Sequence, residues 1–395
     1  MNIDQLLEFD RLAREDGQKY DKKRALYEDI IKDAGDHFIG IVGPRGAGKT
    51  ILLKQLALAN KGSFYISLDA MEGDFFSLIK TLHETMQIKL FLLDEVHIYP
   101  RFEADLKKIY DVLHIKVIFT SSTALGMYGS AYDLSRRVLL KTMYPFSLRE
   151  YALFKYGQKF AALTLGDIVE KNIPSEILKA GEHFSSYIQG GLMPFALREP
   201  QPLKLLENIL KTVIHKDIPR IARLLTDELD NIERLVRFIG LSGVDGINYS
   251  SAAKNVHISN YKAEQYITLL ERAFVLHQVF PKGSNVLKEP KVVMALPYRL
   301  LYRPFNEAIG GLREDFFVET FRSLGKEVFY LKSMRGQKTP DYLIRDREDI
   351  VFEVGGKGKG RSQFKGINVR RKIIFADSYD ISDIRRPLFL AGLLN

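Results

Sequence analysis

The sequence predicts an α/β fold whose first domain holds a parallel β-sheet covered by helices on both faces. Three observations predict it. Short apolar runs alternate with helical patterns between residues 38 and 142, a glycine-rich loop joins the first run to a helix, and two acidic residues follow a later run. Regular alternation of strands and helices is typical of parallel sheets that are buried on both faces.

Composition limits the classes of protein that the chain can belong to. Its 395 residues suffice for two or three domains, so a core can form without disulfides or structural metal. The absence of cysteine excludes a disulfide scaffold, a cysteine-based zinc site, an iron–sulfur cluster and a thiol nucleophile. A net charge of +9 favours polyanionic partners, namely nucleotide, nucleic acid or an anionic membrane surface.

The N-terminal residues do not resemble a targeting segment. No apolar core follows the first basic residues, and no run approaches the roughly 18 apolar residues of a membrane span. We therefore expect a cytoplasmic protein without membrane association. Leucines and an isoleucine in a polar background indicate one or two amphipathic helices, and they are Leu6, Leu7, Leu12, Leu26 and Ile30.

The elements of the first domain follow in order. Strands are predicted at residues 38–42, 63–68, 89–93, 115–119 and 138–141, with helices at 51–59, 75–86 and 102–113. Tyr144–Pro145 closes this region. Residues 146–240 are expected to be mostly helical, with breaks at Gly190–Gly191 and Pro194.

The strongest motif is a phosphate-binding loop. Gly43–Thr50 reads GPRGAGKT, which matches G-x-x-x-x-G-K-[ST] between a predicted strand and a predicted helix. Glycines let successive backbone N–H groups point inward, and the helix N-terminus adds partial positive charge. Lys49 is expected to reach the β- and γ-phosphates of ATP, and the Thr50 hydroxyl is expected to ligate Mg²⁺.

Two carboxylates complete the predicted site. Asp94 and Glu95 follow the apolar run LFLL, at the end of a strand where ligands bind in open parallel sheets. Asp94 is the expected partner of Mg²⁺, and Glu95 is the expected base that orients the attacking water. The alternative interpretation is that both residues cap a helix.

Small hydroxyl residues and arginines supply further candidates. Ser121, in a run of hydroxyl residues after the fourth strand, could contact the γ-phosphate or could belong to a helix cap. Arg136 or Arg137 could act as an arginine finger, in cis or from a neighbouring subunit, or could form a solvated pair. The predicted nucleotide contacts are Gly43, Pro44, Arg45, Gly46, Ala47, Gly48, Lys49, Thr50, Ile51 and Ser121.

The middle of the chain suggests a winged helix. Helices at residues 232–241, 250–256 and 261–273 precede two strands at 276–280 and 291–294. The third helix has no net charge, because its two basic residues, Lys262 and Arg272, are balanced by Glu264 and Glu271. A helix without net positive charge is poorly suited to bind phosphate. The hairpin is more basic, with Lys282, Lys288 and Lys291. Packing against another domain or a protein is the favoured interpretation.

The C-terminal residues resemble a metal-dependent nuclease core. Glu314 lies on a predicted helix at 312–324, Pro340-Asp341 begins an extended segment, and Glu353 lies in an apolar strand. Asp341 and Glu353 would hold Mg²⁺ in such a core. The pattern departs where Gly355 takes the place of lysine, and Lys357 is about 7 Å too far along a regular strand. An inactive, structural domain is therefore favoured over a nuclease.

A basic stretch follows this core. Residues 357–372 contain seven lysines and arginines and no acid: Lys357, Lys359, Arg361, Lys365, Arg370, Arg371 and Lys372. Such a patch suits contact with DNA or RNA, and the alternative is a solvated charged surface.

Several segments together resemble one family. GPRGAGKT, LFLLDE, FTSSTALGM, SRRVLLKTMYPFSLREY and IQGGLMPFAL resemble AAA+-superfamily P-loop ATPases of archaea and bacteria with a winged helix and a restriction-endonuclease-like C-terminal domain. The resemblance implies that the strand carrying Asp94 is separated from the loop strand by the strand at 116–119.

We therefore expect four parts. They are N-terminal helices with a P-loop (AAA+/ASCE) ATPase domain (1–150), a helical lid-like region (151–229), a winged-helix-like domain (230–305) and a small α/β restriction-endonuclease-like domain (306–395). The expected function is Mg²⁺-dependent ATP hydrolysis that moves the domains, on nucleic acid or with a protein partner. The alternatives are a nucleotide-gated binding module with little turnover and a DNA-binding nuclease-like protein.

Overall fold

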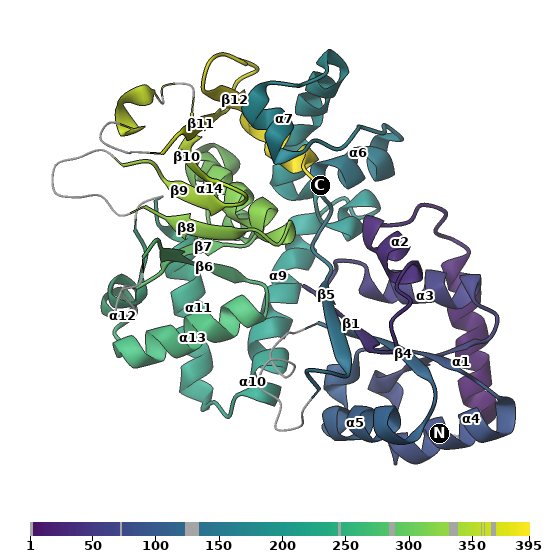
Figure 1. Ribbon diagram of the computed structural model, residues 1–395. Helices are drawn as coiled ribbons and strands as arrows, with labels where there is room; N and C mark the ends of the chain where they lie inside the picture. Colours follow the sequence, from purple (N-terminus) through teal and green to yellow (C-terminus); the bar gives the residue numbers. More distant parts are fainter. Residues whose placement is uncertain are drawn as a thin grey trace. The chain divides into compact units, whose positions relative to one another are not determined.

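The computed structural model describes residues 3–71, 73–122, 134–243, 246–283, 289–331, 339–356, 358, 360–364 and 369–395. The chain divides into two compact units, an N-terminal unit, Met1–Pro145, and a C-terminal unit, Phe146–Asn395. Figure 1 shows each unit with its own sheet. The further predicted boundaries, near residues 229 and 305, stay predictions.

The N-terminal unit is built on a five-stranded sheet with the order β2-β3-β4-β1-β5. All of its strand pairs are parallel. As predicted, β4 separates β3, which ends in Asp94, from β1, which leads into the glycine-rich loop. The strands are β1 (Phe38–Val42), β2 (Ser63–Ser67), β3 (Leu90–Asp94), β4 (Lys116–Ser121) and β5 (Val138–Thr142).

Helices cover both faces of this sheet (Figure 1). Apolar side chains of α2 and α3 pack on one face, and those of α4 and α5 pack on the other. Alternate strand residues serve the two faces, since Phe38 belongs to one core cluster and Ile39 to the other. The helices are α1 (Ile3–Gly17), α2 (Ala25–Ile31), α3 (Lys49–Ala59), α4 (Phe75–Met86) and α5 (Phe102–Val112), with short turns η1 (Leu68–Ala70) and η2 (Val96–Ile98).

The C-terminal unit holds a mixed seven-stranded sheet with the order β12-β11-β10-β9-β8-β6-β7. The predicted hairpin forms between β6 and β7, but it does not stand alone, because Phe280 and Pro281 pair with Phe329 and Tyr330 of β8. The strands are β6 (Leu276–Pro281), β7 (Lys291–Met294), β8 (Glu327–Tyr330), β9 (Tyr342–Arg345), β10 (Asp349–Gly355), β11 (Arg371–Ala376) and β12 (Arg385–Pro387).

The first part of the C-terminal unit is helical, as predicted. Gly190, at φ 115°, breaks one helical run. None of the described helices is both long and apolar enough to cross a membrane. The elements are α6 (Leu148–Tyr156), α7 (Leu165–Glu170), η3 (Ser175–His183), α8 (Phe184–Ser186), η4 (Tyr187–Gly191), η5 (Pro194–Leu197), α9 (Pro202–Thr212), η6 (Val213–Asp217), α10 (Ile218–Ile221), α11 (Thr226–Leu241), α12 (Tyr249–Val256) and α13 (Asn260–Arg272), followed after β7 by η7 (Tyr298–Leu301) and α14 (Phe305–Ser323), and later by η8 (Arg361–Phe364) and η9 (Leu388–Leu393).

Helix α14 forms the core of the C-terminal unit. It begins at Phe305, directly after Pro304, and not at Leu312 as predicted. Phe317 packs 5.2 Å, centroid to centroid, from Phe352 of β10, and Phe352 stacks 5.4 Å from Phe375 of β11. Such aromatic pairs each add about 0.5–1.5 kcal/mol beyond the area that they bury.

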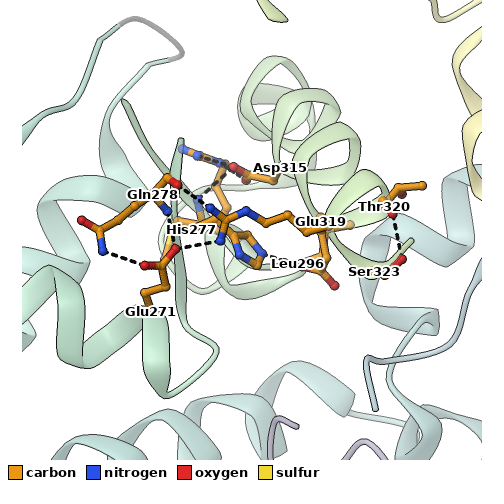
Figure 2. A network of polar contacts seen from close by, with 11 residues as sticks. Glu271, His277, Gln278, Leu296, Asp315, Glu319, Thr320 and Ser323 are labelled. Atoms are coloured by element: carbon orange, nitrogen blue, oxygen red, sulfur yellow. Dashed lines mark hydrogen bonds and ion pairs between the residues drawn. The ribbon is translucent and has the colours of Figure 1, made fainter. Parts of the chain in front are cut away.

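Buried acidic residues of α14 bind the chain around the hairpin (Figure 2). Asp315 accepts hydrogen bonds from Arg299 Nε at 2.6 Å and Nη2 at 2.9 Å, and from the Met294 amide at 3.1 Å. Glu319 accepts one from the Leu296 amide at 2.7 Å. The Met294 amide is at the last residue of β7, and the Leu296 amide lies two residues beyond it. Helix α14 therefore holds the chain at the point where it leaves β7.

A second set of contacts ties α13 to β6. Glu271 accepts hydrogen bonds from the backbone and side-chain amides of Gln278 at 2.8 and 2.7 Å, and from Arg322 of α14 at 2.7 Å. Figure 2 shows Glu271 and Gln278 on one side of this network and Glu319 on the other. The third helix and the hairpin of the predicted winged helix are therefore anchored to α14.

Replacing Asp315 by alanine should destabilise the C-terminal unit by about 3–5 kcal/mol, because it leaves the buried guanidinium of Arg299 without its carboxylate. Urea unfolding followed by circular dichroism measures the change. The matched control is Arg345→Met, which breaks an exposed pair with Glu327 and should cost less than about 1 kcal/mol. Equal losses in the two variants would contradict the prediction.

Glu228 of α11 joins α11 to α13. Its carboxylate accepts hydrogen bonds from the Leu225 amide at 2.9 Å and the Tyr266 hydroxyl at 2.8 Å, and it pairs with Lys262. The Leu225 amide and then Lys262 lower the pKa of Glu228 from 4.5 to about 2.

The stabilisation by Glu228 should therefore depend on pH. Since its folded-state pKa lies below the ordinary value of 4.5, the contribution is complete above about pH 5.5 and is lost as the pH falls toward 2. The free energy of unfolding should differ between wild type and Glu228→Gln at neutral pH, and the difference should shrink below pH 4.5. The exposed Glu307→Gln serves as the control, and a pH-independent difference for Glu228→Gln would refute the assignment.

Candidate functional site

The glycine-rich loop turns from β1 into α3 at the carboxyl edge of the N-terminal sheet. Gly46 and Gly48 have φ angles of 81° and 97°, which glycine adopts without steric cost. Gly48 is the N-cap of α3, and within the described chain no side chain caps this helix end. The N–H groups at the start of α3 are thus directed at the loop, which is the arrangement that binds phosphate.

Two neighbouring segments hold the loop in place. A Cβ atom on Gly43 would lie 2.2 Å from the Met143 carbonyl oxygen, so only glycine fits beside the chain that follows β5. Arg24 donates hydrogen bonds to the carbonyls of Ala47 at 2.9 Å and Tyr144 at 2.8 Å. The loop is therefore supported by the segment before α2 and by the residues after β5.

Lys49 lies over this loop. Its side chain is almost fully buried, and Nζ donates to the carbonyls of Gly43 at 2.7 Å and Pro44 at 2.9 Å. These bonds hold the ammonium group among the backbone atoms of the loop. Thr50 and Ile51 follow in the first turn of α3 and are half-buried. Their contacts with ATP and Mg²⁺ stay predictions.

Asp94 is held at the end of β3 by two hydroxyl groups. Its carboxylate accepts hydrogen bonds from Tyr65 at 2.9 Å and from Thr120. Burial, and then the charge of Asp94, raise the pKa of Tyr65 well above its usual value of 10, so this hydroxyl stays a donor. Asp94 therefore presents an oriented carboxylate at the end of β3, next to β4.

Glu95 adopts an unusual backbone conformation. Its φ is 53°, a left-handed conformation that costs energy in a residue other than glycine and often marks a functional position. Its amide donates to Thr120 Oγ1 at 3.0 Å. The Ser122 hydroxyl lies 2.9 and 3.1 Å from its two carboxylate oxygens.

The charge of Glu95 is also set by its surroundings. Burial alone would raise the pKa of this carboxyl, but contact with His97 and the nearby charges of Lys49 and Arg45 outweigh it and lower the pKa to about 2. Glu95 is thus ionised at neutral pH and lies close to both basic residues of the loop.

Ser121, a predicted nucleotide contact, lies at the end of β4. Ser121 is buried and pairs with Val42, but the hydroxyls that contact the acidic pair come from its neighbours Thr120 and Ser122. This follows from the alternation of side chains along a strand. The rest of the predicted segment, residues 123–127, lies outside the described residues.

Arg137 is not brought to the loop of its own chain. It precedes β5 and binds Asp111 of α5 through Nε at 2.8 Å and Nη2 at 3.1 Å. Its carbonyl accepts from the Phe38 amide, at the amino end of β1, whereas the loop follows the carboxyl end. A role in a neighbouring subunit stays a prediction.

The predicted nuclease residues lie in the C-terminal unit. Glu314 is paired with Lys291 and accepts a hydrogen bond from Tyr342 at 2.6 Å. Burial raises the pKa of Glu314 despite this lysine. Asp341 accepts from the Val354 amide at 2.8 Å, and Glu353 is buried.

A metal site on Asp341 and Glu353 stays a prediction. Among the described residues, no group of three or more histidine, aspartate or glutamate side chains is arranged to hold a metal ion. Lys357 lies outside the described residues.

The predicted basic surfaces are described in part. Lys288, Lys357, Lys359 and Lys365 lie outside the described residues, as does the side chain of Arg361. Of the others, Lys282 pairs with Asp349, and Arg371 pairs with Glu348 at 2.9 Å and Glu170 at 3.6 Å. These charges are therefore partly neutralised within the unit.

Sequence reasoning missed the residues that orient the acidic pair. Tyr65, Thr120, Ser122 and His97 contact Asp94 or Glu95, and Arg24 supports the loop. The hydroxyl run at 120–123 was a visible signal for two of them. Tyr65 and Arg24 carried none, because their roles depend on which strand and which segment lie next to the site.

Gly43→Ala should displace the phosphate-binding loop, because the added Cβ would overlap the Met143 carbonyl. We expect a stability loss of about 1–3 kcal/mol and at least roughly tenfold weaker binding of a fluorescent ATP analogue. Gly62→Ala is the control, since its Cβ would meet only Asn60 Oδ1, at 3.5 Å. If Gly43→Ala bound the ATP analogue as tightly as wild type, the close approach of Gly43 to the Met143 carbonyl would not control the loop.

Comparison with known families supports this reading of the N-terminal unit. Residues 36–152 match the AAA domain family, and residues 181–295 match a family described as a domain of unknown function. An uncharacterized protein of Methanocaldococcus jannaschii is 26% identical over 92% of this chain and 87% of its own length.

The solved structures that the chain matches have low overall similarity to it. AMPPCP-bound DnaA from Aquifex aeolicus has a TM-score of 0.26 at 16% identity, over 62% of this chain and 86% of its own. The RuvB Holliday junction branch migration motor of Thermotoga maritima has 0.25 at 13%, over 71% and 90%. The Hsp104–ADP complex of S. cerevisiae has 0.32 at 15%, over 67% and 41%.

The ligands and activities that these names mention belong to the named proteins. The residues that match this family form a parallel sheet with the order β2-β3-β4-β1-β5, with a glycine-rich loop after β1 and an acidic pair after β3. The chain is therefore similar to the AAA domain family over residues 36–152, and its N-terminal unit has the parallel-sheet P-loop fold.

Proposed function

We propose that the N-terminal unit binds ATP with Mg²⁺ and hydrolyses the ATP to ADP and phosphate, and that the nucleotide state controls the C-terminal unit. The observation that supports it best is that Lys49, Asp94 and Glu95 lie together at one edge of the parallel sheet, close enough for Lys49 to lower the pKa of Glu95.

The loop and α3 account for phosphate binding. The N–H groups at the start of α3 donate to phosphate oxygens, and the helix end favours negative charge. Lys49 exchanges its bonds to the Gly43 and Pro44 carbonyls for contacts with the β- and γ-phosphates. Arg45 adds a second positive charge near Glu95.

The residues present fit Mg²⁺. This ion is usually held by one or two carboxylates together with water and substrate phosphates, not by a cage of protein ligands. Asp94, oriented by Tyr65 and Thr120, and the Thr50 hydroxyl supply that minimal set. When bound, Mg²⁺ neutralises charge on the transferred phosphoryl group.

Glu95 supplies the base. Its carboxylate is ionised, because its pKa is about 2, and it is held by Ser122. It orients a water molecule and accepts its proton as the oxygen attacks the γ-phosphate. A positioned general base of this kind contributes about 10²–10⁴-fold in rate.

The measurement that tests this is phosphate release by wild type, Lys49→Ala and Glu95→Gln, with ATP-analogue affinity measured in parallel. Glu95→Gln should bind the analogue and hydrolyse ATP at least about 10²-fold more slowly, whereas Lys49→Ala should bind it poorly. Chelation of Mg²⁺ by EDTA should stop release, and added Mg²⁺ should restore it.

The outcomes separate the alternatives. Equal hydrolysis by all three proteins would refute the assignment. Tight binding with no turnover in wild type would favour a nucleotide-gated binding module. Repeating the assay with DNA, RNA or a candidate protein tests whether a partner stimulates turnover, and sedimentation in the presence of ATP tests whether the chain forms an oligomer.

A further inference from the structure

His97 lies two residues after Glu95 and shares its turn. It is on η2, for which Glu95 is the N-cap. Its imidazole is 5% exposed, and Nδ1 lies 3.1 Å from Glu95 Oε2. The Ile98 amide donates to the Glu95 carbonyl, so the two side chains project from one hydrogen-bonded turn.

The surroundings of this imidazole are not those of a residue that merely fills the core. Within the described residues, Nε2 has no hydrogen-bond partner, and the Nδ1–Oε2 contact is short but off the ideal hydrogen-bond direction. Burying an imidazole in this way opposes folding. An apolar side chain would fill the same space at lower cost, so folding alone does not account for a histidine here.

The contact with Glu95 does account for it. The Ser122 hydroxyl approaches both carboxylate oxygens of Glu95, which leaves the carboxylate able to turn about this single donor. A second contact at Oε2, from Nδ1 of His97, removes that freedom. Contacts that are imperfect without substrate commonly tighten when it binds.

We propose that His97 is a positioning residue that holds the Glu95 carboxylate, through Nδ1, in the orientation needed to accept a proton from the attacking water. This inference rests on the proposed hydrolysis of ATP. His97 does not touch the substrate. It acts by restricting Glu95, and a displacement of about 1 Å in a reacting group can cost about 10²-fold in rate.

Three substitutions in the full chain test the role of the two ring nitrogens. The amide nitrogen of asparagine occupies the place of Nδ1, that of glutamine occupies the place of Nε2, and leucine has neither. We expect His97→Leu and His97→Gln to lower kcat about 10–100-fold with KM and ATP-analogue affinity within about threefold of wild type. His97→Asn should recover kcat to within about threefold of wild type.

Thermal unfolding gives an independent readout. Because the imidazole is poorly satisfied, His97→Leu should keep or raise the unfolding temperature while it slows hydrolysis, whereas a purely structural histidine would lose stability and retain kcat. His83→Leu is the control. It removes another histidine of this unit, which lies on α4 and contacts the Ile88 carbonyl at 2.7 Å. This variant should leave kcat within about twofold of wild type.

The failures are distinguishable. If wild type releases no phosphate, the proposed function and the role of His97 are both overturned. If wild type hydrolyses ATP and His97→Leu matches it, or if the asparagine and glutamine variants are equally active, only the role of His97 is overturned.

Discussion

The parallel register of β1, β4 and β3 is the constraint on which the candidate site depends. Val42 lies opposite Ser121, and Leu93 lies opposite Phe119, so the carboxyl ends of the three strands meet at one edge. The glycine-rich loop, the acidic pair and the hydroxyl residues of β4 each follow one of these ends. A slip of one residue in either pairing would turn the side chains of β4 to the opposite face of the sheet and separate Thr120 and Ser122 from their partners.

The site is built at a cost to local stability. Glu95 has a left-handed backbone, His97 is buried with little hydrogen bonding, and Lys49 is buried among carbonyls. These features are tolerated because the apolar residues of α2–α5 pack tightly on both faces of the sheet. Strain of this kind persists only where the surrounding structure over-determines it.

The C-terminal unit is organised around α14 in a different way. Its aromatic residues pack on β10 and β11, while its acidic residues bind the backbone near β7 and the guanidinium of Arg299. The predicted winged helix is thereby joined to the last strands through one helix and one sheet. Such buried polar contacts stabilise little beyond an apolar core, but removing one partner leaves the other buried and uncompensated.

Local pattern was enough to predict the strands and helices of the N-terminal unit and the roles expected of Lys49, Thr50, Asp94 and Glu95, because the phosphate-binding loop and the buried strands have short-range signatures. It also located α11–α13 and the hairpin. It missed the seven residues of α14 before Leu312. In the structure, Gly311 gives Arg299 room to reach Asp315. Where Arg137, Tyr65 and His97 lie, and whether the hairpin stands alone, depended on the three-dimensional arrangement. These are contacts between segments distant in sequence or directions taken by side chains on a strained turn, and neither leaves a periodic trace in the chain.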